Sequence, residues 1–142
     1  MSMFKLPLAI ACCALIAISI AGCSHAEPAV ADNIPWRTDY TAALAEGKQA
    51  GKPILIDFSA TWCPPCQEMK HSAWPDPRVG QLAGSAYIPL AMDVDAAGSQ
   101  DAAHRYGITT IPAILVVDGD GKVLRQSSYM SADELAAFLA AK

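Results

Sequence analysis

The chemistry of this chain centres on two cysteines that are separated by two residues. Cys63 and Cys66 lie in Trp62-Cys63-Pro64-Pro65-Cys66, after an apolar run that predicts a buried strand over 54–60 and before a stretch that predicts a helix. A thiol at a helix start is close to free backbone N–H groups and to the positive end of the helix dipole, which lowers its pKa. Cys66 lies one turn further along, within bonding reach of Cys63, and is expected to be the more shielded of the two. The pattern predicts a pair that closes and reopens a disulfide, with Cys63 as nucleophile and Cys66 as resolving thiol.

Two other interpretations of the pair are weaker. An inert buried pair has no need of a strand-to-helix turn with Trp and Pro around it. A four-coordinate zinc site needs two further ligands, and His25, His71 and His104 stand nowhere near a second close pair of cysteines. We therefore expect catalysis with no metal, and no flavin or nicotinamide site is visible in the sequence.

The first 35 residues are expected to lie outside the folded domain. Lys5 precedes a run over 6–20 that is almost wholly apolar, which is the layout of a secretory signal and short for a membrane span of about 20 residues. The run ends in Ile20-Ala21-Gly22-Cys23, which resembles the lipobox of bacterial lipoproteins. This resemblance implies a signal peptide over 1–22, a lipid on Cys23, a tether over 23–35 and a location on the periplasmic side of a bacterial membrane. An ordinary signal peptide that is cut elsewhere is the alternative.

Composition limits the classes of partner. The chain has 142 residues, enough for one domain with a hydrophobic core over 36–142, and a formal net charge of -4. Basic residues form no cluster, so nucleic acid is not an expected partner. Of the five cysteines, Cys12 and Cys13 are expected to leave with the signal. Once Cys23 carries its lipid, Cys63 and Cys66 are the remaining thiols, and in an oxidising compartment they depend on redox partners.

The remaining elements follow from periodicity and capping residues. Asp39, Asp76 and Ser131 are predicted to begin helices, the last with Glu134 in a capping box. Trp36 is expected to pack under the first of these helices. Two closely spaced prolines, at 75 and 77, end the helix that follows the cysteines. The predicted helices cover 40–51, 64–72, 77–83, 99–106 and 132–141, and the predicted strands cover 54–60, 86–93, 113–117 and 122–126.

A mixed sheet with helices on both faces is an α/β arrangement, and from residue 36 to the end the chain resembles thioredoxin-like proteins. The resemblance rests on the run 57–66, on Tyr106-Gly107-Ile108-Thr109-Thr110-Ile111-Pro112-Ala113 and on the terminal hairpin and helix. Within that family the chain is similar to the periplasmic reductase branch, which includes the C-terminal domain of the membrane reductant transporter DsbD. Gly-Lys-Pro before the first strand and Trp-Pro-Asp-Pro-Arg-Val after the redox helix carry this placement.

The resemblance implies roles for further residues. Asp57 matches the buried acid of thioredoxins, whose pKa burial raises and which accepts the Cys66 proton through a water during resolution. A carboxylate bonded to backbone or to a lysine is the alternative. Pro112 is expected to follow a cis peptide bond, and Ile111 to present its backbone to an extended substrate. Trp62, Pro64 and Pro65 are expected to border the same docking surface.

Three further features of the sequence refine the expected redox potential, the surroundings of the buried acid and the shape of the docking groove. Pro64 and Pro65 have no N–H to donate to a Cys63 thiolate, which favours a stable disulfide and a reducing or intermediate potential. Ala91 stands where cytosolic thioredoxins have a lysine near the buried acid. Ser128-Tyr129 replaces a glycine before the last helix, which makes the rim of the docking groove bulkier.

Together these features predict a membrane-tethered thiol:disulfide oxidoreductase of the cell envelope. Its expected task is to pass electrons from a membrane thiol reductant to oxidised cysteines of other envelope proteins. A disulfide oxidase or isomerase is the alternative within the enzyme class. A copper metallochaperone that uses Cys63 and Cys66, and a binding module without catalysis, are the alternatives from other classes.

Overall fold

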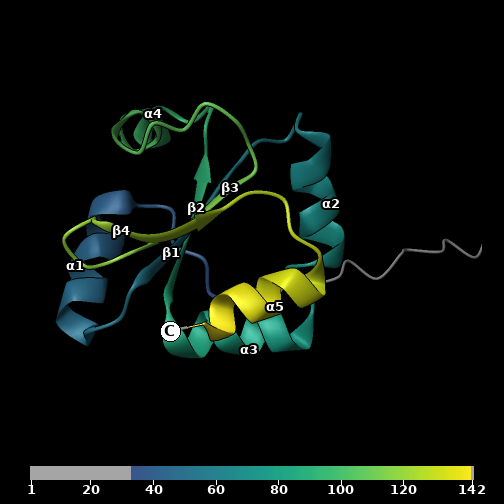
Figure 1. Ribbon diagram of the computed structural model, residues 1–142. Coiled ribbons are helices and arrows are strands. Elements are labelled where there is room, and N and C mark those ends of the chain that lie inside the picture. Colours follow the sequence, from purple (N-terminus) through teal and green to yellow (C-terminus); the bar gives the residue numbers. More distant parts are fainter. Residues whose placement is uncertain (1–32, 142) are drawn as a thin grey trace, which may run out of the picture.

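The computed structural model describes residues 33–141, and its centre is a mixed sheet (Figure 1). Within these residues the sheet has four strands in the order β2-β1-β3-β4. β1 is parallel to β2 and antiparallel to β3, and β3 is antiparallel to β4. The strands are β1 (Ile54–Ser59), β2 (Ile88–Asp93), β3 (Ala113–Val117) and β4 (Val123–Ser127). Each lies within two residues of its predicted bounds at both ends.

Helices cover both faces of this sheet, and side-chain alternation along β1 decides which helices meet which face. Ile56 and Phe58 share one core cluster with side chains of α1 and α4, whereas Leu55 belongs to a second cluster with side chains of α2, α3 and α5. Figure 1 shows α5 lying alongside α3. The helices are α1 (Tyr40–Ala50), α2 (Pro64–Ser72), α3 (Pro77–Ala86), α4 (Ala97–Arg105) and α5 (Ala132–Ala140).

The helix starts predicted at Asp39, Asp76 and Ser131 are confirmed, whereas α4 begins at Ala97, two residues before its predicted start. An Asp39 carboxylate oxygen accepts from the N–H of Ala42 at 2.8 Å, and Asp76 caps α3 in the same way. Ser131 and Glu134 form the predicted capping box at the start of α5. Each cap satisfies backbone donors that the first helical turn leaves unpaired. The predicted end of α3 is three residues too early, since the helix continues to Ala86 before the chain becomes extended at Tyr87.

Pro89 lies inside β2 without interrupting its pairing to β1. Its carbonyl oxygen accepts from the N–H of Arg37 at 2.8 Å, and the N–H of Ala91 donates to the Arg37 carbonyl at the same distance. Because the N and C=O of a strand residue point to the same side, the proline nitrogen faces the outer edge of the sheet. No ladder bond between β1 and β2 is therefore lost.

The segment before α1 differs from the prediction. Trp36 packs edge-on against Trp74, with ring centroids 4.9 Å apart, and so lies against the cluster of α2, α3 and α5. The expectation that it packs under α1 is wrong. Ile34 is also buried in that cluster, so the core begins before residue 36. The predicted signal peptide, the lipidated Cys23 and most of the predicted tether lie outside the described residues.

Candidate active site

Cys63 is the N-cap residue of α2, as the sequence predicts. Pro64 and Pro65 occupy the first two helical positions and have no N–H to offer. The N–H of Cys66 donates to the Cys63 sulfur at an N–Sγ distance of 3.3 Å. The first helical turn therefore supplies the sulfur with a single backbone donor, from the residue to which it is covalently joined.

The two cysteines form a disulfide in this structure, with their Cα atoms 5.3 Å apart. Both are buried, Cys63 being 3% exposed and Cys66 5% exposed. The two cysteines are thus buried to a similar extent, and the structure does not distinguish Cys66 as the more shielded of the two. Ile111 packs against the cluster that holds both sulfurs, while Cys66 also lines a cavity beneath α2.

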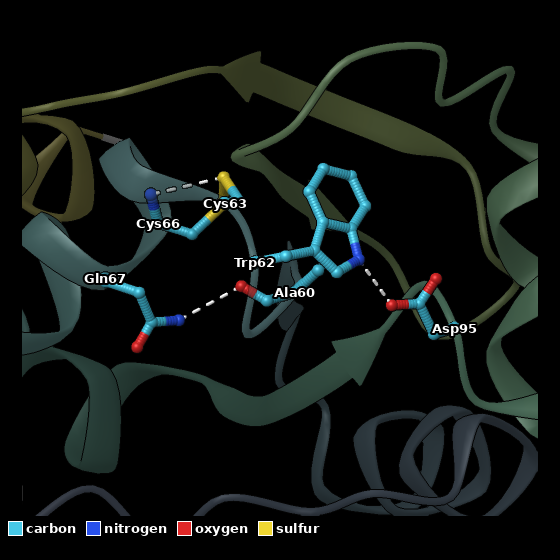
Figure 2. The surroundings of a disulfide bond; sticks show 6 residues. All are labelled: Ala60, Trp62, Cys63, Cys66, Gln67 and Asp95. Atoms are coloured by element: carbon cyan, nitrogen blue, oxygen red, sulfur yellow. Dashed lines mark hydrogen bonds between the residues drawn. A yellow bond between two sulfur atoms is a disulfide. The ribbon is translucent and has the colours of Figure 1, made fainter.

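Two side-chain hydrogen bonds hold the segment before the disulfide (Figure 2). The Gln67 side-chain amide donates to the Ala60 carbonyl at 3.0 Å, which ties α2 to the end of β1. The Trp62 indole N–H donates to a carboxylate oxygen of Asp95 at 2.6 Å. Trp62 is nevertheless 64% exposed, so this bond fixes the orientation of an aromatic surface beside the cysteines.

The segment that leads into β3 approaches the disulfide from the other side. The Ile111–Pro112 peptide bond is cis, which confirms the prediction. Ile111 is half-buried and packs on the cluster of Ala60, Cys63 and Cys66, whereas Pro112 is buried. Trp62 and Ile111 line one groove together. Trp62 and Ile111 are thus on neighbouring segments, and Pro64, two residues after Trp62, is exposed.

Asp57 lies behind the disulfide. It is half-buried and lines a cavity of about 380 Å³ together with Cys66 and Lys70. The register places Ala91 of β2 opposite Asp57, as the comparison with cytosolic thioredoxins predicts. The structure therefore brings the expected base and the expected resolving thiol to one cavity.

The loop before α5 reaches α2 through one side chain. The Tyr129 hydroxyl donates to a Glu68 carboxylate oxygen at 2.6 Å, and Tyr129 remains 41% exposed. This hydrogen bond raises the pKa of Tyr129 above its usual value. A side chain thus bridges loop and helix at the position where the sequence predicts a bulkier rim.

Sequence reasoning missed three residues that support this region: Gln67, Lys70 and Asp95. Gln67 and Lys70 follow the cysteine motif directly, so their helical positions relative to Cys66 were a usable signal. Asp95 is 33 residues from its partner Trp62, and no local pattern indicates that bond. Of the histidines, His71 and His104 are both exposed, as expected.

Comparison with known proteins identifies the family. A family model described as thioredoxin-like matches residues 35–119, more than half of the chain. The chain belongs to the thioredoxin-like family. A curated relative, the thiol:disulfide interchange protein DsbD of Salmonella typhi, is 35% identical over 104 residues, which is 72% of this chain and 18% of that protein. The chain therefore spans less than a fifth of the length of the curated relatives it matches.

Solved structures share the fold of this chain. A DsbH oxidoreductase superposes with a TM-score of 0.64 and 25% identity, covering 72% of this chain and 78% of that one. The oxidised C-terminal domain of DsbD from Neisseria meningitidis gives a TM-score of 0.57 at 24% identity, covering 72% and 95%. The thioredoxin fold expected from the sequence is confirmed.

Residues 33–141 offer neither a membrane-spanning helix nor a cluster of metal ligands. No helix in this range is long and apolar enough to cross a membrane. No three His, Cys, Asp or Glu side chains in the same range are grouped so that they could hold a metal ion.

Proposed function

We propose that this protein is a thiol:disulfide oxidoreductase that reduces disulfides of other proteins. The observation that carries the proposal is the Cys63–Cys66 disulfide at the start of α2, packed against Ile111 beside a cis proline, in a chain of the thioredoxin-like family. The conformation described here corresponds to the oxidised product of one turnover.

In the reductive direction the reaction has two exchanges. The Cys63 thiolate attacks one sulfur of the substrate disulfide, the substrate S–S bond breaks, and the other substrate sulfur leaves as a thiolate that takes up a proton. Cys66 then loses its proton and attacks the Cys63 sulfur, which breaks the mixed disulfide and releases the second substrate thiol. Two electrons pass to the substrate, and Cys63 and Cys66 are left joined.

Asp57 is the proposed base of the second exchange. Cys66 is buried, so its proton needs an acceptor inside the protein, and both residues line the same cavity. The groove lined by Trp62 and Ile111 is the proposed docking surface. Pro64 is exposed two residues after Trp62, and we propose that it contacts the same substrate. Half-buried Pro65 stiffens the loop between the cysteines.

The reductive direction is supported by the small number of backbone N–H donors that the start of α2 offers to the Cys63 sulfur. Among proteins with a redox-active cysteine pair, a strong oxidant is one whose reduced, dithiol form is stabilised. Here two prolines remove N–H donors from the first turn, and the N–H of Cys66 is the one backbone donor that this turn leaves for the Cys63 sulfur. Weak stabilisation of the thiolate supports a stable disulfide and hence a reductant.

The proposed setting is the cell envelope. The similarity to DsbD supports the periplasmic side of a bacterial membrane, a membrane thiol reductant as electron donor, and envelope proteins with disulfides as clients. Lipid attachment at Cys23 is the proposed anchor and follows from the sequence alone.

The test is the reduction potential of the Cys63–Cys66 pair, measured by equilibration in dithiothreitol and glutathione buffers. A value near that of thioredoxin, about -270 mV, is expected for a reductant that an upstream donor recharges. A value near about -120 mV would identify an oxidase and overturn the proposed direction. A Cys63→Ala variant, which cannot form the disulfide, controls for signals from other thiols.

A further inference from the structure

The cavity beneath α2 has an uneven distribution of charge. Asp57 follows Leu55 by two residues on β1, so both side chains point to the face of the sheet that α2 covers. On α2, Lys70 follows Cys66 by four residues, the spacing that places two side chains on the same side of a helix. All three polar groups, those of Asp57, Cys66 and Lys70, line the cavity of about 380 Å³.

The other charged group that lines this cavity is Asp93, at the end of β2. The strands on either side of Asp57 contribute neutral partners, Ala91 from β2 and Ile114 from β3. The segment before α1 contributes Thr38 and Trp36, and the start of α4 contributes Ser99. Lys70 is the one cationic side chain among the described residues that line the cavity.

We propose that Lys70 is a positioning residue that acts through Asp57, keeping its carboxylate ionised and ready to accept the Cys66 proton. The inference rests on the proposed function, and it names the group that controls the protonation of the base in the second thiol–disulfide exchange. In that step the proton passes from the Cys66 thiol to the Asp57 carboxylate. The Cys66 electron pair forms the bond to the Cys63 sulfur, and the substrate sulfur leaves with the pair of the broken bond.

The sign of the effect follows from the charges that face the carboxyl. A cation favours the ionised form of a nearby acid, whereas burial and the Asp93 carboxylate favour the protonated form. Without Lys70 a larger share of Asp57 is protonated at a given pH and cannot act as a base. Because Lys70 is exposed, its effect is partly screened by solvent and weakens as salt is added.

The experiment follows the reduced protein as it reacts with the disulfide 5,5'-dithiobis(2-nitrobenzoate), with Cys12, Cys13 and Cys23 replaced by serine so that two thiols remain. Attack by Cys63 releases the first thionitrobenzoate, and resolution by Cys66 releases the second. The rate of the second release is recorded against pH at low ionic strength. This second phase isolates the step in which the Cys66 proton is removed.

In a Lys70→Met variant the acid limb of the second phase is expected to move up by about half to one pH unit, because a nearby cation shifts a carboxyl by about that much after screening. Lys70→Arg is expected to restore the original profile. Lys122→Met removes the same charge from the exposed turn before β4 and is expected to leave the profile unchanged. Added salt is expected to shrink the difference between the Lys70→Met variant and the parent.

The double variant decides whether Lys70 acts through Asp57. If it does, Lys70→Met has no further effect on the second phase in an Asp57→Asn background. A persistent effect there, or superimposable profiles for the parent and Lys70→Met, would overturn the inference. Absence of both release phases in the parent would instead contradict the proposed function, so the two failures are distinguishable.

Discussion

The oxidised protein is expected to be more stable to unfolding than the reduced protein, and the difference can be estimated from the structure. The disulfide closes a short loop, since the cysteines are three residues apart. In the chain-entropy model a loop of that size stabilises the folded state by about 2 kcal/mol. A Cys63 thiolate at the N-terminus of α2 regains about 0.3–1 kcal/mol for the reduced form. The oxidised form should therefore be more stable than the reduced form by roughly 1–1.7 kcal/mol.

The assay is guanidinium unfolding of the protein with serine at positions 12, 13 and 23, once as the disulfide and once with excess reductant. The difference between the two free energies of unfolding equals the difference in disulfide stability between the folded and unfolded chain. The expected difference converts to about 20–35 mV, because about 1.4 kcal/mol corresponds to 30 mV for two electrons. In a Cys66→Ala control the reductant should change nothing.

A reduced form as stable as the oxidised form, or more stable, would refute this reasoning. Such a result would mean that groups other than the Cys66 N–H stabilise the Cys63 thiolate. That is the behaviour of an oxidase, in which the folded protein favours the dithiol.

Three further predictions concern single substitutions and pH. Gly80→Ala should stabilise α3 by about 0.5–1 kcal/mol, because no atom lies within 4 Å of the added Cβ. Gly47→Ala should instead destabilise the protein by about 1–2 kcal/mol, since its Cβ would lie 2.8 Å from a backbone oxygen. Changes of the same sign in the urea-unfolding free energies of the two variants would contradict this contrast. Cys66→Ala should accumulate mixed disulfides on non-reducing gels, and Cys63→Ala should not. Hydrogen bonds from Arg78 lower the pKa of Asp76 to about 2, below its ordinary 3.8. The contribution of ionised Asp76 to folding stability is therefore full above about pH 4 and is lost as the pH falls towards 2. Over that range the Tm of Asp76→Asn should fall less steeply with decreasing pH than the Tm of the parent.

Local chemistry made much of this fold predictable. The caps at Asp39, Asp76 and Ser131 use donors within a few residues of the acceptor, and the strand bounds follow from apolar runs. The cysteine pair and the cis bond before Pro112 were predictable from short motifs. These features depend on residues that are close in the chain, which is why periodicity and short motifs could predict them.

The contacts that escaped prediction join segments that are distant in sequence. Trp36 meets Trp74, and Trp62 bonds to Asp95, through packing that no window of sequence contains. The relative exposure of Cys63 and Cys66 also depends on such packing. Ile111 packs against their cluster, and Cys66 but not Cys63 lines the cavity beneath α2.

Charge near the proposed base shows how local and distant information combine. The sequence indicated that β2 offers Ala91, and the register confirms that this neutral residue faces Asp57. Helical spacing could place Lys70 beside Cys66, but only the packing of α2 over the Leu55 face of β1 brings that lysine to the cavity of Asp57. A cavity bordered by several elements can receive a charge from any of them, because the electrostatic effect depends on distance and burial and not on which element supplies the group. The absence of a lysine from one strand therefore does not decide whether the acid has a cation nearby.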